Sequence, residues 1–226
     1  MKNNMITYGI AIVAFIVVQI MLATGSMSSL MKGLLVPLCT YAILAVSLNL
    51  TVGILGELSL GHAGFMCVGA FASAFFSVCT AQSIHNDLLR FMIALLIGAV
   101  TAGLFGILIG IPVLRLQGDY LAIVTLAFGE IIKNVINALY VGIDGHGLHV
   151  SLKDSASLNL EADGRVIING AQGISGTPND STFIIGFILL IVPLVIVLNM
   201  VNSRTGRAVM AIRDNKIAAE SVGINI

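Results

Sequence analysis

The chain has 226 residues, of which 58% are hydrophobic and only 10% are charged, and its mean hydropathy is +1.03. A soluble domain normally carries about a quarter charged residues, so the composition excludes a water-soluble globular protein. Eleven basic and eleven acidic side chains cancel, so the net charge does not point to a nucleic-acid partner, and none is expected. We therefore predict an all-α fold, a polytopic helical membrane protein.

Six stretches are apolar enough to supply the roughly 20 residues that a helix needs to cross the hydrocarbon core. They are, approximately, Met5–Ala23, Leu34–Leu55, Gly61–Ala81, Leu88–Leu114, Tyr120–Val141 and Phe183–Val201. The first is longer than the core of a signal peptide, about 7–15 residues, which favours a retained span over a cleaved leader. The pattern predicts about six transmembrane spans.

Basic residues near the ends of spans indicate which side is cytoplasmic. Arg204, Arg207, Arg213 and Lys216 follow the last span closely. Placing them inside predicts two cytoplasmic termini and an extracytoplasmic loop at 142–182. This loop is either a solvated excursion or a docking surface for an external partner.

Turn and ligand patterns occur within this loop. Asp163-Gly164, between Leu158–Ala162 and Arg165–Asn169, predicts a β-hairpin. His146 and His149 lie three residues apart, but no third ligand accompanies them, so a metal site is not expected.

The sequence contains no recognisable catalytic, metal-binding or nucleotide-binding motif. Cys39, Cys67 and Cys79 lie in apolar stretches without metal-ligand spacing, which is typical of small core residues. The chain has no phosphate-binding G-x-x-x-x-G-K-[ST] loop. We expect neither an enzyme nor a cofactor, and any ATP hydrolysis would belong to a partner.

Glycines and polar residues interrupt the second and third apolar stretches. Glu57, Ser59, Gly61 and His62 lie where the sequence stays apolar enough for the membrane, and Asn49 precedes them. Irregular backbone at membrane depth is normally satisfied by protein or by a watery cavity, which makes these residues candidates for a pathway. The alternatives are a short cytoplasmic turn with a solvated Glu57, a packing role for His62 and an interhelical hydrogen bond for Asn49.

Two further patterns concern the fourth and fifth stretches. Ala102, Gly106 and Gly110 recur every four residues and predict a face for close helix packing. Glu130 and Lys133 are three apart and are expected to pair. Glu130 is either a pathway residue or the neutralised half of this pair.

Three blocks of sequence resemble the permeases of branched-chain amino-acid ABC transporters, specifically their M-type (LivM-like) subunits. They are Ser47–Gly53 with Leu58–Phe65 (SLNLTVG and LSLGHAGF), Leu114–Ile132 (LRLQGDYLAIVTLAFGEII) and Ser203–Asn225, which is similar to the cytoplasmic coupling loop. The resemblance implies a permease domain at 1–201, containing the loop at 142–182, and a coupling loop at 202–226.

This family resemblance implies a half-transporter in the bacterial inner membrane. Expected partners are membrane lipid, a second (H-type) permease, two ATP-binding subunits that use the ATP, and an extracytoplasmic binding protein that delivers leucine, isoleucine or valine. In this family further spans follow the coupling loop, so the sequence ending at Ile226 is expected to be truncated at its C-terminus.

Carried over by position, the resemblance assigns the contact with the ATPase. Ala218, Ala219 and Gly223 match the core of the importer coupling signature, whereas Ile217 replaces its usual acidic residue. Gly223 is expected to end a short helix with a left-handed cap. The remaining expected coupling residues, which turn and anchor the chain past the last span, are Gly206, Arg207 and Arg213.

Other functions remain open on the sequence alone. Urea or amide permeases are the nearest alternative in substrate. An ion-coupled secondary transporter would use Glu57 or Glu130 as its proton-linked carboxylate. A membrane scaffold without transport would assemble with partners but carry no substrate.

Overall fold

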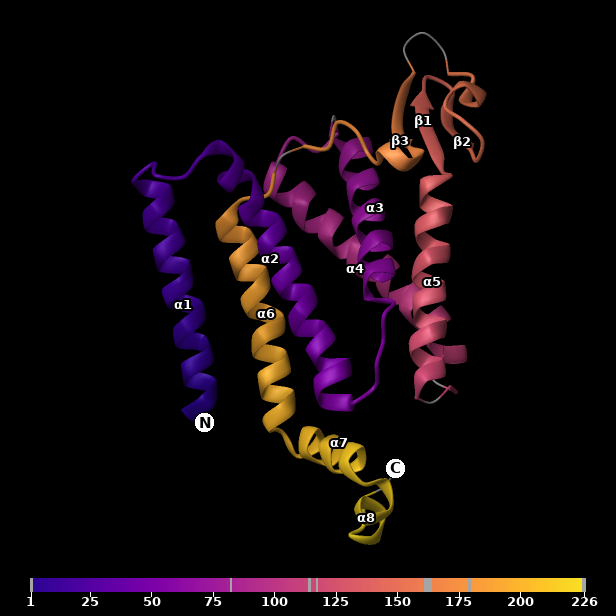
Figure 1. Ribbon diagram of the computed structural model, residues 1–226. Helices are drawn as coiled ribbons and strands as arrows, with labels where there is room; N and C mark the ends of the chain where they lie inside the picture. Colours follow the sequence, from indigo (N-terminus) through magenta and orange to yellow (C-terminus); the bar gives the residue numbers. More distant parts are fainter. Residues whose placement is uncertain are drawn as a thin grey trace. The chain divides into compact units, whose positions relative to one another are not determined.

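The computed structural model describes residues 2–81, 83–113, 115–116, 118–160, 164–178 and 180–224 (Figure 1). The chain forms two compact units, one from Met1–Gly56 with Ser181–Ile226 and the other from Glu57–Asp180. Five helical segments among the described residues are long and apolar enough to cross a membrane: Met5–Ala23, Ser29–Leu55, His62–Thr80, Asp87–Val113 and Phe183–Asn202. These segments confirm the predicted polytopic helical membrane protein.

The first unit is built on α2 (Ser29–Asn49) and α6 (Phe183–Asn202), which lie side by side (Figure 1). Gly186 of α6 faces Cys39 of α2, where an added Cβ would lie 3.3 Å from the cysteine Cβ. Small residues at such a contact let two membrane helices approach closely. α1 (Lys2–Ala23) contacts α6 through Phe15, whose ring stacks at 4.4 Å on that of Phe187.

The second unit contains α3 (His62–Thr80), α4 (Asp87–Val113) and α5 (Asp119–Asn137). α3 and α4 touch at Gly69 and Gly98, where a Cβ on Gly98 would lie 2.8 Å from the Gly69 carbonyl oxygen. The predicted packing face on α4 is therefore in contact at Ala102, which meets Gly69. Among the described residues, nothing lies within 4 Å of a Cβ built on Gly106 or Gly110.

The fifth predicted span is wrong in its C-terminal boundary. The apolar window extended to Val141, but the helix ends at Asn137 and a strand begins at Tyr140. α5 is also not among the five segments long and apolar enough to span a membrane. Its 19 residues include three charged ones, Asp119, Glu130 and Lys133, which lower its apolar character.

A three-stranded antiparallel sheet follows α5 in the order β2-β1-β3. Its strands are β1 (Tyr140–Asp144), β2 (Gly147–Ser151) and β3 (Arg165–Asn169). The tight hairpin joins β1 to β2, and the Asp144 carboxylate accepts hydrogen bonds from the backbone N–H groups of His146 and Gly147. Such an Asx turn closes the hairpin locally.

The hairpin predicted around Asp163-Gly164 is wrong in its pairing. Ala156–Leu158 forms a 3-10 turn (η2) instead of a strand, and β3 pairs with β1, which lies much earlier in the chain. A second 3-10 turn, η3 (Gly170–Gln172), follows β3. Residues 161–163, which include the aspartate of the predicted turn, lie outside the described residues.

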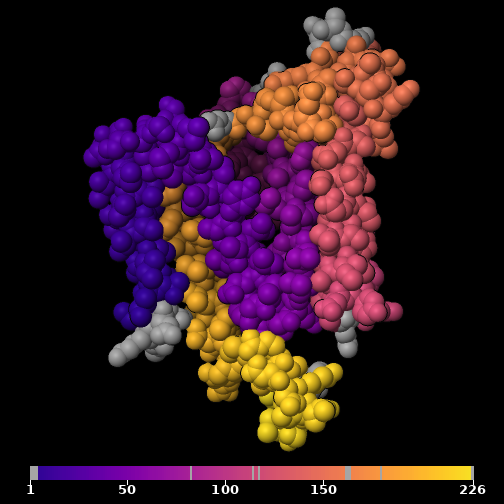
Figure 2. Space-filling model, in the orientation of Figure 1, coloured from indigo at the N-terminus to yellow at the C-terminus, as the bar shows by residue number. Residues whose placement is uncertain are grey.

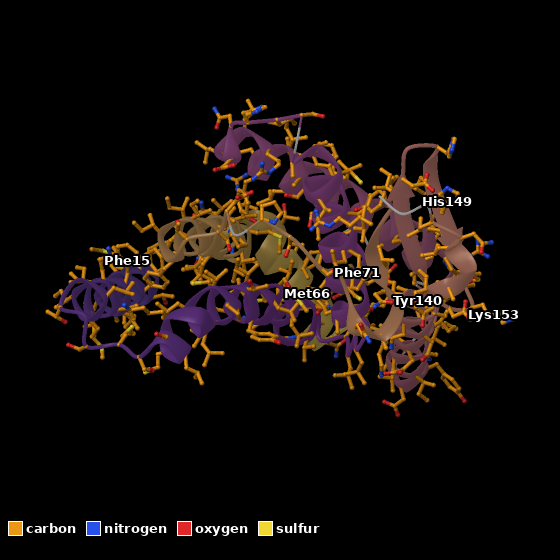
Figure 3. All side chains as sticks on the ribbon, turned by 90° about the horizontal axis from the view of Figure 1, so that it is seen from above. Phe15, Met66, Phe71, Tyr140, His149 and Lys153 are labelled. Carbon is orange, nitrogen blue, oxygen red and sulfur yellow. The ribbon has the colours of Figure 1, made fainter. Side chains whose placement is uncertain are left out.

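The sheet packs on the C-terminal part of α3. Val141, Ile167 and Ile168 are buried, and Phe71 and Phe75 of α3 pack against them. Figure 3 labels Phe71 of α3, Tyr140 at the start of β1, His149 in β2 and Lys153 just after that strand. In Figure 2 the sheet region covers the end of α5. The sheet is therefore part of the second unit and not a free loop.

A buried arginine ties the end of the loop to α4. Nη2 of Arg90 lies 2.7 Å from an Asp180 carboxylate oxygen and 2.9 Å from one of Asp87. Its Nη1 donates to the carbonyl oxygen of Ile84. The Arg90 side chain is only 5% exposed, so its charge depends on these partners.

Candidate functional site

The turn from α6 into α7 (Arg204–Asp214) depends on Ser203 and Gly206. The Ser203 hydroxyl oxygen accepts from the Gly206 N–H at 3.0 Å, which caps the new helix. Gly206 is buried, and a Cβ there would overlap the carbonyl oxygen of Met200 and lie 2.7 Å from that of Val201. Only glycine therefore lets α7 leave α6 at this angle, while the neighbouring Arg207 remains exposed.

At the other end of α7, Arg213 bonds to the segment that follows α2. Its Nη1 donates to the carbonyl oxygen of Gly53 at 2.7 Å. Its Nε and Nη2 donate to the carboxylate of Asp214 at 3.0 and 2.7 Å, which orients the guanidinium. A bond from a charged donor is stronger than a neutral one, so Arg213 fixes α7 against this segment.

The segment that Arg213 contacts is a π-helical turn, η1 (Leu50–Leu55), which ends at Gly56. Gly56 has φ +75, and a Cβ on it would lie 2.6 Å from Cγ of Arg213. Glycine is required here for two reasons, the left-handed backbone and the space taken by the arginine stem. The break after α2 and the position of α7 therefore depend on each other.

The short helix α8 (Lys216–Ser221) follows directly and is capped at both ends. The Asn215 side chain accepts from the Ala218 N–H at 3.0 Å. Gly223 has φ +86, its N–H bonds to the Glu220 carbonyl, and the Ile224 N–H bonds to that of Ala219. This pair of bonds is a Schellman motif, so the predicted left-handed cap at Gly223 is confirmed.

α8 exposes apolar side chains. Ile217 is 81% exposed and Val222 77%, whereas Ala219 is buried at 3%. Ala218 is exposed. Ile217 lies within α8 and Val222 directly follows it, so the capped helix holds both exposed side chains in place.

The candidate pathway residues are distributed over both units. In the first unit, Asn49 is exposed on the unit's surface, and its side chain lies over Gly53, one turn further on. The Asn49 side chain therefore packs along its own helix.

In the second unit, residues 57–61 are irregular, as the glycine pattern predicted. The Leu60 N–H donates to Thr125 Oγ1 of α5 at 3.0 Å, and Thr125 is 7% exposed. Gly61 is buried, and a Cβ on it would lie 2.9 Å from the Thr125 carbonyl oxygen. α5 therefore supplies the hydrogen-bonding partner that irregular backbone requires.

The other candidates near this break differ in burial. Glu57 is exposed, and Ser59 and His62 are half-buried. Nδ1 of His62 is buried and has no hydrogen-bond partner among the described residues. A buried polar atom without a partner is costly, which marks His62 as a position that another group would satisfy.

Glu130 and Lys133 pair as predicted, with Nζ 2.9 Å from a carboxylate oxygen. Their side chains are 54% and 59% exposed. Within this unit the pair lies on an exposed side of α5, where the two opposite charges offset each other.

Three residues of the site were not predicted from the sequence: Gly53, Gly56 and Thr125. Gly56 belongs to the glycine-rich interruption, but the sequence does not show that an arginine stem fills the space above it. Thr125 is one hydroxyl in an apolar helix, and such a hydroxyl is a weak signal for a partner of distant backbone.

One of the two loop histidines lies next to a carboxylate of the same hairpin. His149 Nε2 lies 3.0 Å from a carboxylate oxygen of Asp144, and within the described ranges no cluster of three or more His, Cys, Asp or Glu side chains is placed to hold a metal.

Comparison with known proteins covers most of the chain. Residues 30–226 match the family described as branched-chain amino acid transport system, permease component. The chain is 32% identical over 194 residues to the high-affinity branched-chain amino acid transport system permease protein LivM of Escherichia coli (strain K12). Its identity to the LivM protein of Salmonella typhimurium is 31%. The matches cover 82% of this chain and 44% of each relative, so the chain spans about half their length. No solved structure matches the chain.

Proposed function

Because the chain belongs to the permease-component family of branched-chain amino acid transport systems, we propose that it is a permease subunit of an ATP-driven importer. In this proposal it forms part of the translocation pathway for leucine, isoleucine and valine. It binds no nucleotide itself and moves in response to two ATP-binding partner subunits. Its family is one of transport permeases and not of enzymes.

The observation that carries the proposal is the rigid attachment of α7 and α8 to the end of α2. Arg213 joins α7 to the Gly53 carbonyl oxygen, and Gly206 sets the angle at which α7 leaves α6. A partner subunit that binds the exposed side chains of Ile217 and Val222 would therefore move α2 and α6 together. In this way a nucleotide-driven movement outside the membrane would reach the spans.

We propose that α5 also crosses the membrane, giving six crossings and two cytoplasmic termini. Within the second unit, Leu121 near the start of α5 packs with Val113 at the end of α4. The sheet that follows α5 packs on the C-terminal part of α3. α5 therefore extends over the same depth as α3 and α4, and its 19 residues would measure about 28 Å.

The proposed assembly contains a second, H-type permease, two ATP-binding subunits and an extracytoplasmic binding protein, in the inner membrane of a bacterium. The sheet of the second unit would lie on the extracytoplasmic side, where the binding protein docks. The proposed pathway residues are Asn49, Glu57, Ser59, Gly61, His62 and Glu130, and the proposed ATPase contacts are Gly206, Arg207, Arg213, Ala218, Ala219 and Gly223.

Co-purification with a transport assay tests the proposal. We expect the tagged chain, expressed with its neighbouring transport genes, to recover ATP-binding subunits and to support ATP-dependent leucine uptake in vesicles. Recovery of ATPases with uptake of urea or amides instead would change the substrate but keep the class. Uptake that a protonophore abolishes, with no ATPase recovered, would overturn the proposal and favour an ion-coupled carrier using Glu57 or Glu130.

A further inference from the structure

The second unit contains an apolar groove of about 590 Å³. It is lined by α3, α4 and α5 and ends at the sheet. Residues of its wall include Phe71 and Phe75 of α3, Phe105 of α4, Phe128 of α5, and Leu148 and Ile168 of the sheet. All of its lining side chains within the described residues are apolar, so an occupant would gain no hydrogen bond from a side chain.

This lining excludes an amino acid as the occupant. An amino acid carries an ammonium and a carboxylate, and each would lose its hydration in the groove without gaining a partner. The groove is therefore separate from the proposed pathway, and the identity of its occupant does not depend on the proposed function.

The shape of the groove suits a flexible occupant. Its volume of about 590 Å³ is bounded by side chains of three helices and the sheet. A hydrocarbon chain can follow such an irregular apolar surface, because its single bonds rotate freely.

The groove continues into the outer apolar surface of the unit. Leu108 of α4 and Ile131 of α5 line it and are 70% and 55% exposed. α4 is long and apolar enough to cross a membrane, so an acyl chain of the bilayer would reach this surface from the side, without passing through water.

The sheet extends the same apolar surface. Leu148 lines the groove and is 52% exposed, and Val150, two residues further along β2, points to the same side of the sheet and is 58% exposed. The intervening His149 is on the opposite side, where it pairs with Asp144. One side of the hairpin is thus apolar and continuous with the groove.

We propose that the groove binds an acyl chain of a membrane phospholipid, with Leu148 and Val150 in contact with the lipid at the membrane surface. The bound chain covers the four phenylalanine rings and joins the sheet to the helices. The ligand class is a phospholipid of the surrounding bilayer.

Photolabelling tests this site. The full chain is placed in vesicles that contain a phospholipid with a diazirine on its acyl chain, and labelled peptides are mapped by mass spectrometry. We expect peptides of α3, α5 and β2 that line the groove to be labelled severalfold more than equally exposed apolar peptides of α1. Ala72→Phe, which fills the groove from its wall, should reduce this labelling severalfold, as should Leu148→Ser at the exposed sheet end.

The matched control is Val100→Phe on α4, because Val100 is 59% exposed and does not line the groove. It should leave the labelling unchanged. If Ala72→Phe does not fold, the exposed Leu148→Ser variant provides the test alone. Labelling no stronger than on α1, or insensitive to both variants, would overturn the proposal. Labelling that disappears when the partner subunits assemble would also overturn it and assign the groove to a protein contact.

Discussion

The guanidinium of Arg213 donates a hydrogen bond to the carbonyl oxygen of Gly53, 160 residues earlier in the chain, at 2.7 Å. The bond connects the helix that follows the last apolar span to the π-helical turn at the end of α2. The geometry explains why the chain needs glycine at position 56 and a long basic side chain at position 213. It also indicates how a force applied to α7 and α8 reaches α2.

Replacing Arg213 by methionine tests this connection. Methionine keeps the apolar stem over Gly56 but loses the charged donor, whose bond is worth on the order of 1 kcal/mol at this partly exposed site. We expect leucine uptake to fall severalfold while ATPase recovery in a pull-down is unchanged. Asp214→Ala, which leaves the bond to Gly53 in place, is the control and should have a smaller effect. Normal uptake by the methionine variant would show that the bond is not needed for coupling.

Gly56→Ala tests the backbone at the break. A residue other than glycine in the left-handed region costs about 1–3 kcal/mol, and the added methyl group would also displace the Arg213 stem. We expect a lower melting temperature in detergent and reduced uptake. Gly33→Ala is the control, since Gly33 lies within α2, where none of the described residues comes within 4 Å of an added Cβ, and alanine is the better helix former. Equal melting temperatures for the two variants would contradict this role of Gly56.

Gly223→Val tests the cap of α8. Valine is strained at φ +86, so the Schellman motif should open and displace Val222. We expect weaker recovery of the ATP-binding subunits, with normal membrane insertion. Gly25→Val carries the same kind of strain at φ +69, between α1 and α2, and should not affect the recovery. Equal ATPase recovery by wild type and Gly223→Val would count against a role for α8 in binding.

The Arg90–Asp180 pair is expected to stabilise the second unit. Among the described residues, Asp180→Leu leaves the buried guanidinium with only the exposed Asp87 as an acidic partner, and breaking a buried pair in this way costs about 3–5 kcal/mol. We expect a clear loss of thermal stability in detergent. The double variant Arg90→Met with Asp180→Leu should recover much of it, because no buried charge remains. A double variant no more stable than Asp180→Leu would contradict this explanation.

Local features of the fold were predictable from the sequence. The length of the apolar stretches predicted the membrane-spanning helices. The three-residue spacing predicted the Glu130–Lys133 pair, and Gly223 after a short helical pattern predicted the left-handed cap. Each of these depends on residues close together in the chain, where spacing and backbone preference decide the structure.

Features that depend on distant residues were not predictable. β3 pairs with β1 and not with the segment just before it, and α4 packs through Gly98 and not through Gly106 or Gly110. Gly98, Ala102, Gly106 and Gly110 are spaced every four residues, and only the position of α3 decides which part of this stripe is in contact. The bond between Arg213 and Gly53 likewise has no local signal.

Coupling to ATP hydrolysis requires that an ATP-binding subunit holds α8. A photo-crosslinking amino acid at Ile217, which is 81% exposed, tests this contact in the assembled complex, with the same group at Ile10 of α1 as the control. We expect an adduct between position 217 and the ATP-binding subunit, and none from position 10. An intact complex in which position 217 gives no such adduct would contradict the proposed coupling.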